Sequence, residues 1–189
     1  MAEIAIGESR KTCIDRGKRP VSTPEDVKGL KIRTQENQIH LLVWRALGAL
    51  PTPMALPEVF TSLQNGTVDG QENPIGAIIN NKFGQVQKYL TLTNHAFTPI
   101  GMVMSPAAYS ALSAEDRKMI TEAARNAMKV CKEQVAIVER TGVDTLRGQG
   151  MQVVEKVDTA KFQAQLGGAY TELGKRFGDA AINRIRDYK

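Results

Sequence analysis

Residues 50–74, LPTPMALPEVFTSLQNGTVDGQENP, constrain the fold of this chain more than any other stretch. They predict a short strand, a helix that begins at Pro57 and ends at Gly66, and a second short strand. Proline suits a first helical turn, where its missing N–H would have no partner, and glycine suits the left-handed residue past a helix end. We therefore expect the ends of two neighbouring parallel strands, near Ala55 and Asn73, side by side at the sheet edge where ligands bind in open α/β folds.

The residues on either side continue this alternation. Leu30–Arg33 predicts a strand with one buried face, and Asn37–Leu47 predicts a helix that Gly48 ends. Ile75–Gln87 predicts a further helix and Tyr89–Thr93 a further strand. Residues 29–93 therefore predict an α/β fold with a central, mostly parallel sheet flanked by helices.

A long helix dominates the second half of the chain. Residues 99–105 predict an extended segment, and Ser113 is placed to cap a helix with acidic residues in its first turn. Apolar residues then keep a three-or-four spacing for about five turns. They are Ile120, Ala123, Ala124, Ala127, Cys131, Val135 and Val138. Gln152–Val157 predicts a last strand, and Asp158 caps a predicted final helix that runs to Phe177, before Gly178.

The composition is that of an ordinary globular protein, with 42% hydrophobic and 24% charged residues among 189. A formal net charge of +5 favours anionic partners. Five basic residues lie close together near the N-terminus: Arg10, Lys11, Arg16, Lys18 and Arg19. No interleaved aromatic residues or reading helix accompany them, so we expect Met1–Glu25 to be a solvated or partly disordered entry segment. A basic module that binds anions or nucleic acid remains an alternative.

Several classes of protein are disfavoured. The chain has no glycine-rich nucleotide motif, no zinc-protease motif and no serine-hydrolase motif, and it has two histidines, His40 and His95. Cys13 and Cys131 have no metal-ligand spacing, and two thiols are favoured over a disulfide. The N-terminus lacks the pattern of a signal peptide, and the apolar runs are too short for a membrane span. We expect no enzyme activity, no metal, no cofactor and no export signal.

Two polar residues at predicted strand ends are the main candidates for a binding site. Arg33 ends one strand and Asn73 another, so both are expected at the same sheet edge. A guanidinium matches a carboxylate with two parallel hydrogen bonds, and an amide can orient that carboxylate or a nearby hydroxyl. The alternatives are an exposed strand-end arginine and a turn residue before Pro74.

The residues quoted above resemble a known family. PTPMALPEVFTSLQNGTVDGQENP, with TPEDVKGLKIRTQ and WRALGA before it and KYLTLTNH and LSAEDRKMITEAA after it, is similar to the solute-binding proteins of tripartite ATP-independent periplasmic (TRAP) transporters. The similarity runs from about residue 19 to the C-terminus. It implies a periplasmic receptor with two lobes that closes around an organic acid and delivers it to membrane permease subunits.

The resemblance also implies roles for single residues. Arg33 in KGLKIR matches the arginine that clamps the substrate carboxylate, and Asn73 in DGQENP matches a ligand-contacting asparagine. Leu56 stands where receptors for sugar acids often carry an aromatic residue, so its aliphatic side chain disfavours a bulky ring. Glu36 and His95 fall near positions of the cleft.

Members of this family are longer, with more than a hundred residues before the point where this sequence begins. The resemblance therefore assigns residues 1–98 and 139–189 to the second lobe, and residues 99–138 to a first lobe that is otherwise missing. The long helix would then expose an apolar stripe and favour a homodimer. We expect a half receptor that binds organic acids weakly or not at all. A truncated product with no function, or a purely structural one, remains an alternative.

Overall fold

A seven-stranded sheet organises the fold, in a computed structural model that describes residues 2–186, with residues 2–11 and Arg186 by their backbone alone. The strands are β1 (Ala2–Arg16), β2 (Lys31–Thr34), β3 (Leu50–Pro53), β4 (Gly70–Pro74), β5 (Tyr89–Thr91), β6 (Phe97–Met104) and β7 (Gln152–Val154). The helices are α1 (Gln38–Ala46), α2 (Leu56–Gln64), α3 (Ile75–Asn80), α4 (Pro106–Ala111), α5 (Ala114–Gly148), α6 (Thr159–Ala164), α7 (Gly167–Phe177) and α8 (Asp179–Arg186). Two 3-10 turns, η1 (Pro24–Val27) and η2 (Phe83–Gln85), complete the elements.

The strand order is β3-β2-β4-β1-β5-β7, and β6 pairs with β1 outside this path. The β2–β3, β2–β4 and β5–β7 pairs are parallel, whereas β1 is antiparallel to its neighbours. The predicted α/β class with a central sheet flanked by helices is confirmed. The sheet is mixed rather than mostly parallel, because the β1–β4, β1–β5 and β1–β6 pairs are antiparallel. The expectation that the strands ending near Ala55 and Asn73 are neighbours is wrong, because β2 lies between β3 and β4. This position gives β2 a hydrogen-bonded neighbour on each side. Its Ile32 side chain is fully buried.

The N-terminal segment is the largest departure from the sequence analysis. Instead of a solvated entry segment, Ala2–Arg16 is the longest strand, and Thr12–Arg16 is buried between β4 and β5. Farther toward the N-terminus, the same strand pairs with β6 alone. Pairing with three other strands satisfies the backbone hydrogen-bonding groups of β1 and so stabilises a long strand. The local amino-acid composition gives no sign of this pairing.

Local chemistry sets the helix ends as predicted. The Asn37 side chain accepts hydrogen bonds from two amides at the start of α1, and the Ser113 side chain caps α5. Pro57 lies in the first turn of α2, and Gly66 follows this helix with a φ of 71°. This left-handed conformation is one that glycine adopts without steric cost.

Two predicted helices are shorter than the apolar spacing suggested. The helix expected over Ile75–Gln87 ends at Asn80, because Lys82 has a left-handed backbone with a φ of 57°. The final helix is divided into α6 and α7 before the glycine pair Gly167 and Gly168, which weakens helix propagation. Asp158 caps α6 as predicted.

Each face of the sheet has its own apolar core. One core lies under α2 and α3 and continues to the end of α5, with Phe83 and Leu146 fully buried. The other lies under α1 and centres on Trp44, with Phe162 of α6 packed against it. The strands of the sheet therefore separate two layers of side chains, and successive residues of β4 point into different layers.

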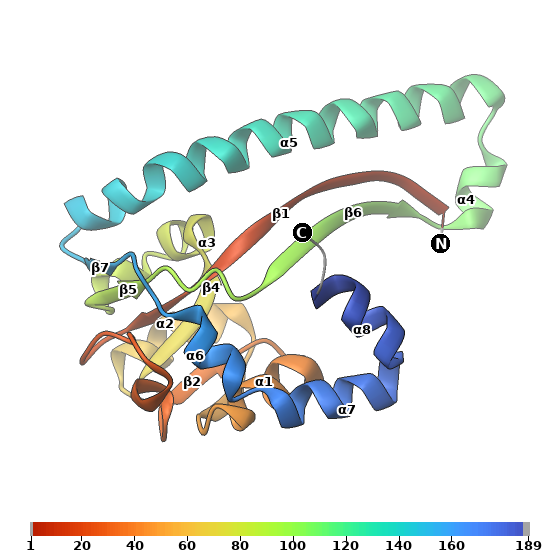
Figure 1. Ribbon diagram of the computed structural model, residues 1–189. Helices are drawn as coiled ribbons and strands as arrows, with labels where there is room; N and C mark the ends of the chain where they lie inside the picture. The colour runs from red at the N-terminus through yellow and green to blue at the C-terminus, as the bar shows by residue number, and fades with distance from the viewer. Residues whose placement is uncertain (1, 187–189) are drawn as a thin grey trace.

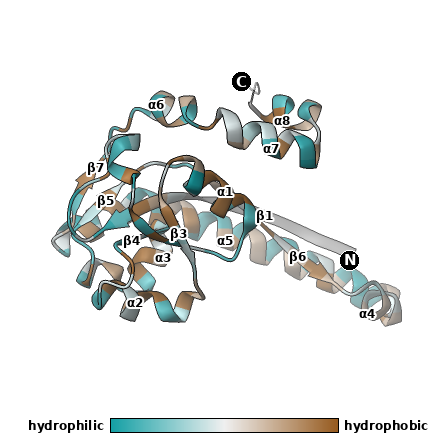
Figure 2. Ribbon diagram, turned by 90° about the horizontal axis from the view of Figure 1, so that it is seen from below, coloured by the Kyte–Doolittle hydropathy of each residue, from teal (hydrophilic) through white to brown (hydrophobic). Residues whose placement is uncertain are grey.

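The long helix α5 has 35 residues and runs along the ribbon formed by β1 and β6 (Figure 1). Seen from below, β1, β6 and α5 extend together away from the sheet toward α4 (Figure 2). Gly142 allows α5 to approach α3 closely, because a Cβ there would overlap Cγ2 of Ile75. No helix within residues 2–186 is both long and apolar enough to cross a membrane.

The predicted apolar stripe of this helix is not left open. Ala124 is 4% exposed and Val135 is 9% exposed, because α5 packs against β1 and α3. Ile120 is half-buried, and Ala127 is exposed as expected. The large apolar residues that α5 does expose lie elsewhere on its surface: Met119, Val130 and Ile137.

Candidate functional site

Four of the five residues predicted for the ligand site line one open hollow at the carboxyl ends of β2, β3 and β4. They are Arg33, Glu36, Leu56 and Asn73, and the hollow has a volume of about 440 Å³. Gln35, Met54 and Ala55 complete its lining and were not predicted. This is the edge at which open α/β sheets bind ligands.

Arg33 lines this hollow and is only 2% exposed. Its Nε and Nη2 donate to the Met54 carbonyl oxygen at 3.0 and 2.7 Å. Its Nη1 is buried and has no hydrogen-bond partner among the described residues. Burial lowers the pKa of Arg33 from its usual value, and the nearby charge of Glu72 opposes this. An unpaired donor on a buried cation is costly.

Asn73 belongs to a chain of buried hydrogen bonds that sequence analysis missed. Its Nδ2 donates to Oε1 of Gln71, and Nε2 of Gln71 donates to Oδ2 of Asp15. Burial raises the pKa of Asp15 to about 8, although hydrogen bonds from Gln71 act in the opposite direction. Asp15 was overlooked because it lies in the segment expected to be solvated.

A second polar network lies on the opposite face of β4, around Glu72. This carboxylate is 1% exposed and accepts from Thr34 Oγ1 at 2.7 Å, from His40 Nδ1 at 2.9 Å and from His95 Nε2 at 3.3 Å. Burial alone would raise the pKa of Glu72, but the bonds from the two histidines lower it to about 2. The bond to Glu72 in turn raises the pKa of His40, against the effect of burial. Every polar side-chain atom of this cluster that is buried has a partner.

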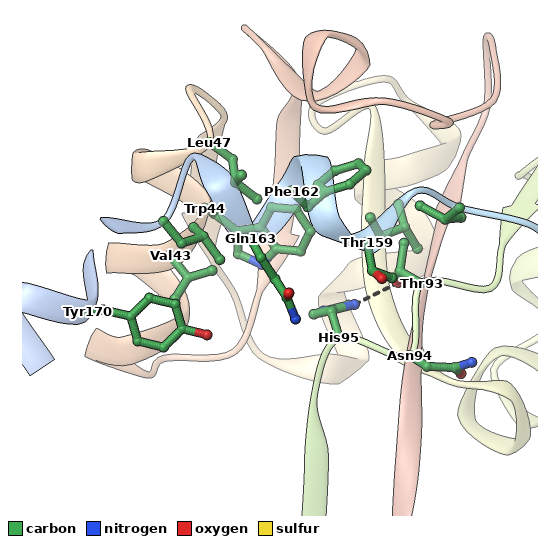
Figure 3. Close-up of a pocket in the computed structure, with 13 residues that line it drawn as sticks. Val43, Trp44, Leu47, Thr93, Asn94, His95, Thr159, Phe162, Gln163 and Tyr170 are labelled. Carbon is green, nitrogen blue, oxygen red and sulfur yellow. Dashed lines mark hydrogen bonds between the residues drawn. The ribbon is translucent and has the colours of Figure 1, made fainter. Parts of the chain in front are cut away.

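His95 is the one predicted site residue that does not lie in the hollow. It lines a separate cavity of about 220 Å³ between α1 and α6, where Trp44, Phe162, Gln163 and Tyr170 also lie (Figure 3). Its Nδ1 is hydrogen-bonded to Thr93 Oγ1 at 2.7 Å, and its ring meets the Trp44 ring edge-on, with centroids 5.2 Å apart. Its Nε2 is hydrogen-bonded to Glu72, which lies next to Asn73 on β4 but does not line the hollow.

The basic residues near the N-terminus do not form one exposed cluster. Arg16 is 8% exposed, and its Nη1 donates to the Asp26 carbonyl oxygen at 3.0 Å. Lys18 pairs with Asp69 at 3.5 Å. The side chains of Arg10 and Lys11 lie outside the described residues.

The cysteines and the possible metal ligands are also placed. Cys13 is buried on β1 and Cys131 is half-buried on α5, and the two are not joined in a disulfide. In the part of the chain that the structure describes, no three His, Cys, Asp or Glu side chains are grouped so that they could hold a metal ion.

This chain is similar to known solute-binding proteins. The family model "DctP: Bacterial extracellular solute-binding protein, family 7" matches residues 8–176. A solute-binding protein of Verminephrobacter eiseniae is 44% identical over 97% of this chain and 55% of its own length. The 2,3-diketo-L-gulonate-binding periplasmic protein of Escherichia coli is 34% identical over 97% of this chain and 52% of its own.

A solved structure is also similar. The TRAP periplasmic solute-binding protein from Polaromonas sp. JS666, bound to D-erythronate, is 42% identical and superposes with a TM-score of 0.92. The match covers 99% of this chain and 62% of that chain. This chain therefore spans about half the length of the curated relatives it matches.

Proposed function

This chain belongs to the bacterial extracellular solute-binding protein family 7, and we propose that it binds a small organic acid for uptake by a TRAP-type transporter. The observation that carries this proposal is Arg33, a buried cation in the lining of the hollow whose Nη1 has no partner in the described structure. A carboxylate in the hollow would supply the missing acceptor through a charge-assisted hydrogen bond.

The rest of the hollow suits a small, polar acid. Asn73 adds an amide beside Arg33, and Leu56 adds an exposed aliphatic side chain rather than an aromatic ring for a sugar ring to stack on. Glu36 lies at the same hollow and would repel a second negative charge placed near it. We infer an acyclic monocarboxylate, and D-erythronate, the ligand of the similar Polaromonas protein, is a suitable probe.

We further propose that the binding site has two lobes and that these residues supply one wall. Residues 1–98 and 139–189 would form one lobe, and residues 99–138 would belong to the other. β6 and α5 project away from the other strands, and this supports the division (Figure 1). Ala2–Lys11 pairs with β6, so the projecting part consists of this segment, β6 and α5. Ligands held by one wall keep much of their solvent contact, so we expect weak binding, with a Kd on the order of millimolar.

The proposed partners follow from the same assignment. A binding protein of this kind would act outside the cytoplasm with TRAP permease subunits and would catalyse no reaction. Self-association would use exposed apolar residues of the projecting part, such as Phe97, Val103 and Met119. Light scattering at increasing concentration tests this expectation, and a single monomeric species at high concentration would contradict it.

The binding proposal is tested by titration with D-erythronate, followed by NMR, with the neutral amide of the same acid as the matched ligand. We expect shifts that saturate at the Nε signal of Arg33 and at the side-chain amide of Asn73, and we expect the neutral amide to bind at least tenfold more weakly. Equal shifts with both ligands, or no shift at Arg33, would overturn the proposal. Micromolar binding would support the site but contradict the one-wall account.

A further inference from the structure

A row of buried polar side chains crosses three strands behind the hollow. The register pairs Arg33 of β2 with Gln71 of β4, and Gln71 with Asp15 of β1. Asn73 is two residues beyond Gln71, so it lies on the same face of β4. Asp15 and Gln71 are 0% exposed, and Asn73 is 5% exposed.

Asp15 accepts a hydrogen bond from the Gln71 amide. Nε2 of Gln71 donates to Oδ2 of Asp15. An ionised carboxylate can only accept hydrogen bonds, so ionised Asp15 favours this orientation of Gln71. The amide oxygen of Gln71 must then face the opposite way, toward Asn73.

Gln71 in turn determines which way Asn73 faces. The oxygen of Gln71 needs a donor, and Nδ2 of Asn73 supplies it. Asn73 lines the hollow, and its oxygen is the end of the amide that Gln71 does not use. A reversed Asn73 amide would bring two carbonyl oxygens together inside a buried site, where an unpaired acceptor is costly.

From this arrangement we propose that Asp15 and Gln71 are positioning residues that make Asn73 present its carbonyl oxygen to the ligand, so that the site selects 2-hydroxy carboxylates. Arg33 offers a donor for the carboxylate, and Asn73 offers an acceptor for a hydroxyl beside it. An acid without that hydroxyl would leave the Asn73 oxygen without a donor. This inference rests on the proposed function of the hollow as a carboxylate site.

The test compares D-erythronate with 3,4-dihydroxybutanoate, which lacks only the hydroxyl on carbon 2. The chain should bind D-erythronate about threefold to tenfold more tightly, as one neutral hydrogen bond would produce. Gln71→Met should remove this preference, because methionine has no oxygen that accepts from Nδ2 of Asn73. Leu63→Ala, a core change in α2, is the control for reduced stability and should leave the preference unchanged.

The outcomes separate the two proposals. If neither acid binds, the proposed function fails and this inference fails with it. If both acids bind equally well, or if Gln71→Met keeps the preference, the inference is overturned while the carboxylate site stands. Should Gln71→Met not fold, through-hydrogen-bond NMR coupling in the unaltered chain decides the matter. Coupling from Nδ2 of Asn73 to the side-chain carbonyl of Gln71 supports the inference, and its absence overturns it.

Discussion

The two faces of β4 carry polar networks that differ in one decisive respect. On the face of the sheet that α1 covers (the α1 face), Glu72 is an ionised carboxylate that three donors surround. On the face that α2 covers (the α2 face), Arg33 is an equally buried cation, but its Nη1 has no partner among the described residues. The two networks are one residue apart along the strand, because Glu72 lies between Gln71 and Asn73.

We infer from this difference which side of the strand is available for binding. A buried charge with complete hydrogen bonding holds its surroundings in place and has no capacity left for a ligand. A buried charge with one free donor costs stability in the empty protein, and such a cost is typical of sites that a ligand completes. We therefore propose that the α1 network supports the site and that the α2 row contributes ligand contacts to it.

The largest effect is expected when the complete network is broken. Glu72→Ala removes the acceptor shared by Thr34, His40 and His95, and we expect the free energy of unfolding to fall by about 3 to 5 kcal/mol. Urea unfolding measures this change. Glu36→Ala, which removes an exposed carboxylate, is the matched control and should change stability by less than about 0.5 kcal/mol. Similar effects of both substitutions would refute the supporting role of Glu72.

The next effect concerns pH and distinguishes the two faces. The folded-state pKa of Asp15 is raised from 3.8 to about 8, so the folded chain binds a proton that the unfolded chain has lost between these values, and stability falls as pH rises through this window. Glu72 acts oppositely, because its pKa is lowered from 4.5 to about 2 and its contribution is lost as pH falls through that range. We expect the free energy of unfolding to be largest at about pH 4 to 5.

Asp15→Asn should remove the decline above that maximum. The neutral amide has no proton to lose, so the variant should exceed the unaltered chain by a few kcal/mol at pH 8 and by little at pH 4. Denaturant unfolding at a series of pH values checks this expectation. A decline of the same slope in the variant would show that Asp15 is not its source.

A smaller effect is expected from His40. Its pKa is raised by the bond to Glu72, so its contribution is complete below its unfolded value of 6.5 and is lost as pH rises through the folded value. His40→Gln should lower the free energy of unfolding by about 1 kcal/mol at pH 6 and by less at pH 8. A loss that is independent of pH would contradict the charged pairing with Glu72.

Local features of the sequence predicted much of the fold. Pro57, Gly66 and Ser113 identify helix ends through interactions within a few residues, and the structure confirms them. The long strand β1 was missed, because its neighbours β4, β5 and β6 are distant in sequence. A pattern of local residues cannot report such pairing.

The same limit applies to the site. Arg33 and Asn73 could be named because each ends a predicted strand, and they do line one hollow. The bond between Gln71 and Asp15 joins residues 56 positions apart, and that between His40 and Glu72 joins residues 32 apart. The order of the strands in the sheet brings these groups together. The strand order predicted from the sequence was wrong, so these contacts could not be predicted.

The central claim is that Arg33 is kept for binding and not for stability. Its most direct test is the titration of Arg33→Met with D-erythronate, together with urea unfolding of the same variant. We expect at least a tenfold loss of affinity and a free energy of unfolding within about 1 kcal/mol of the unaltered chain, because methionine fills the space without a buried, unpaired donor. Retained affinity together with a loss of stability comparable to that of Glu72→Ala would contradict the account.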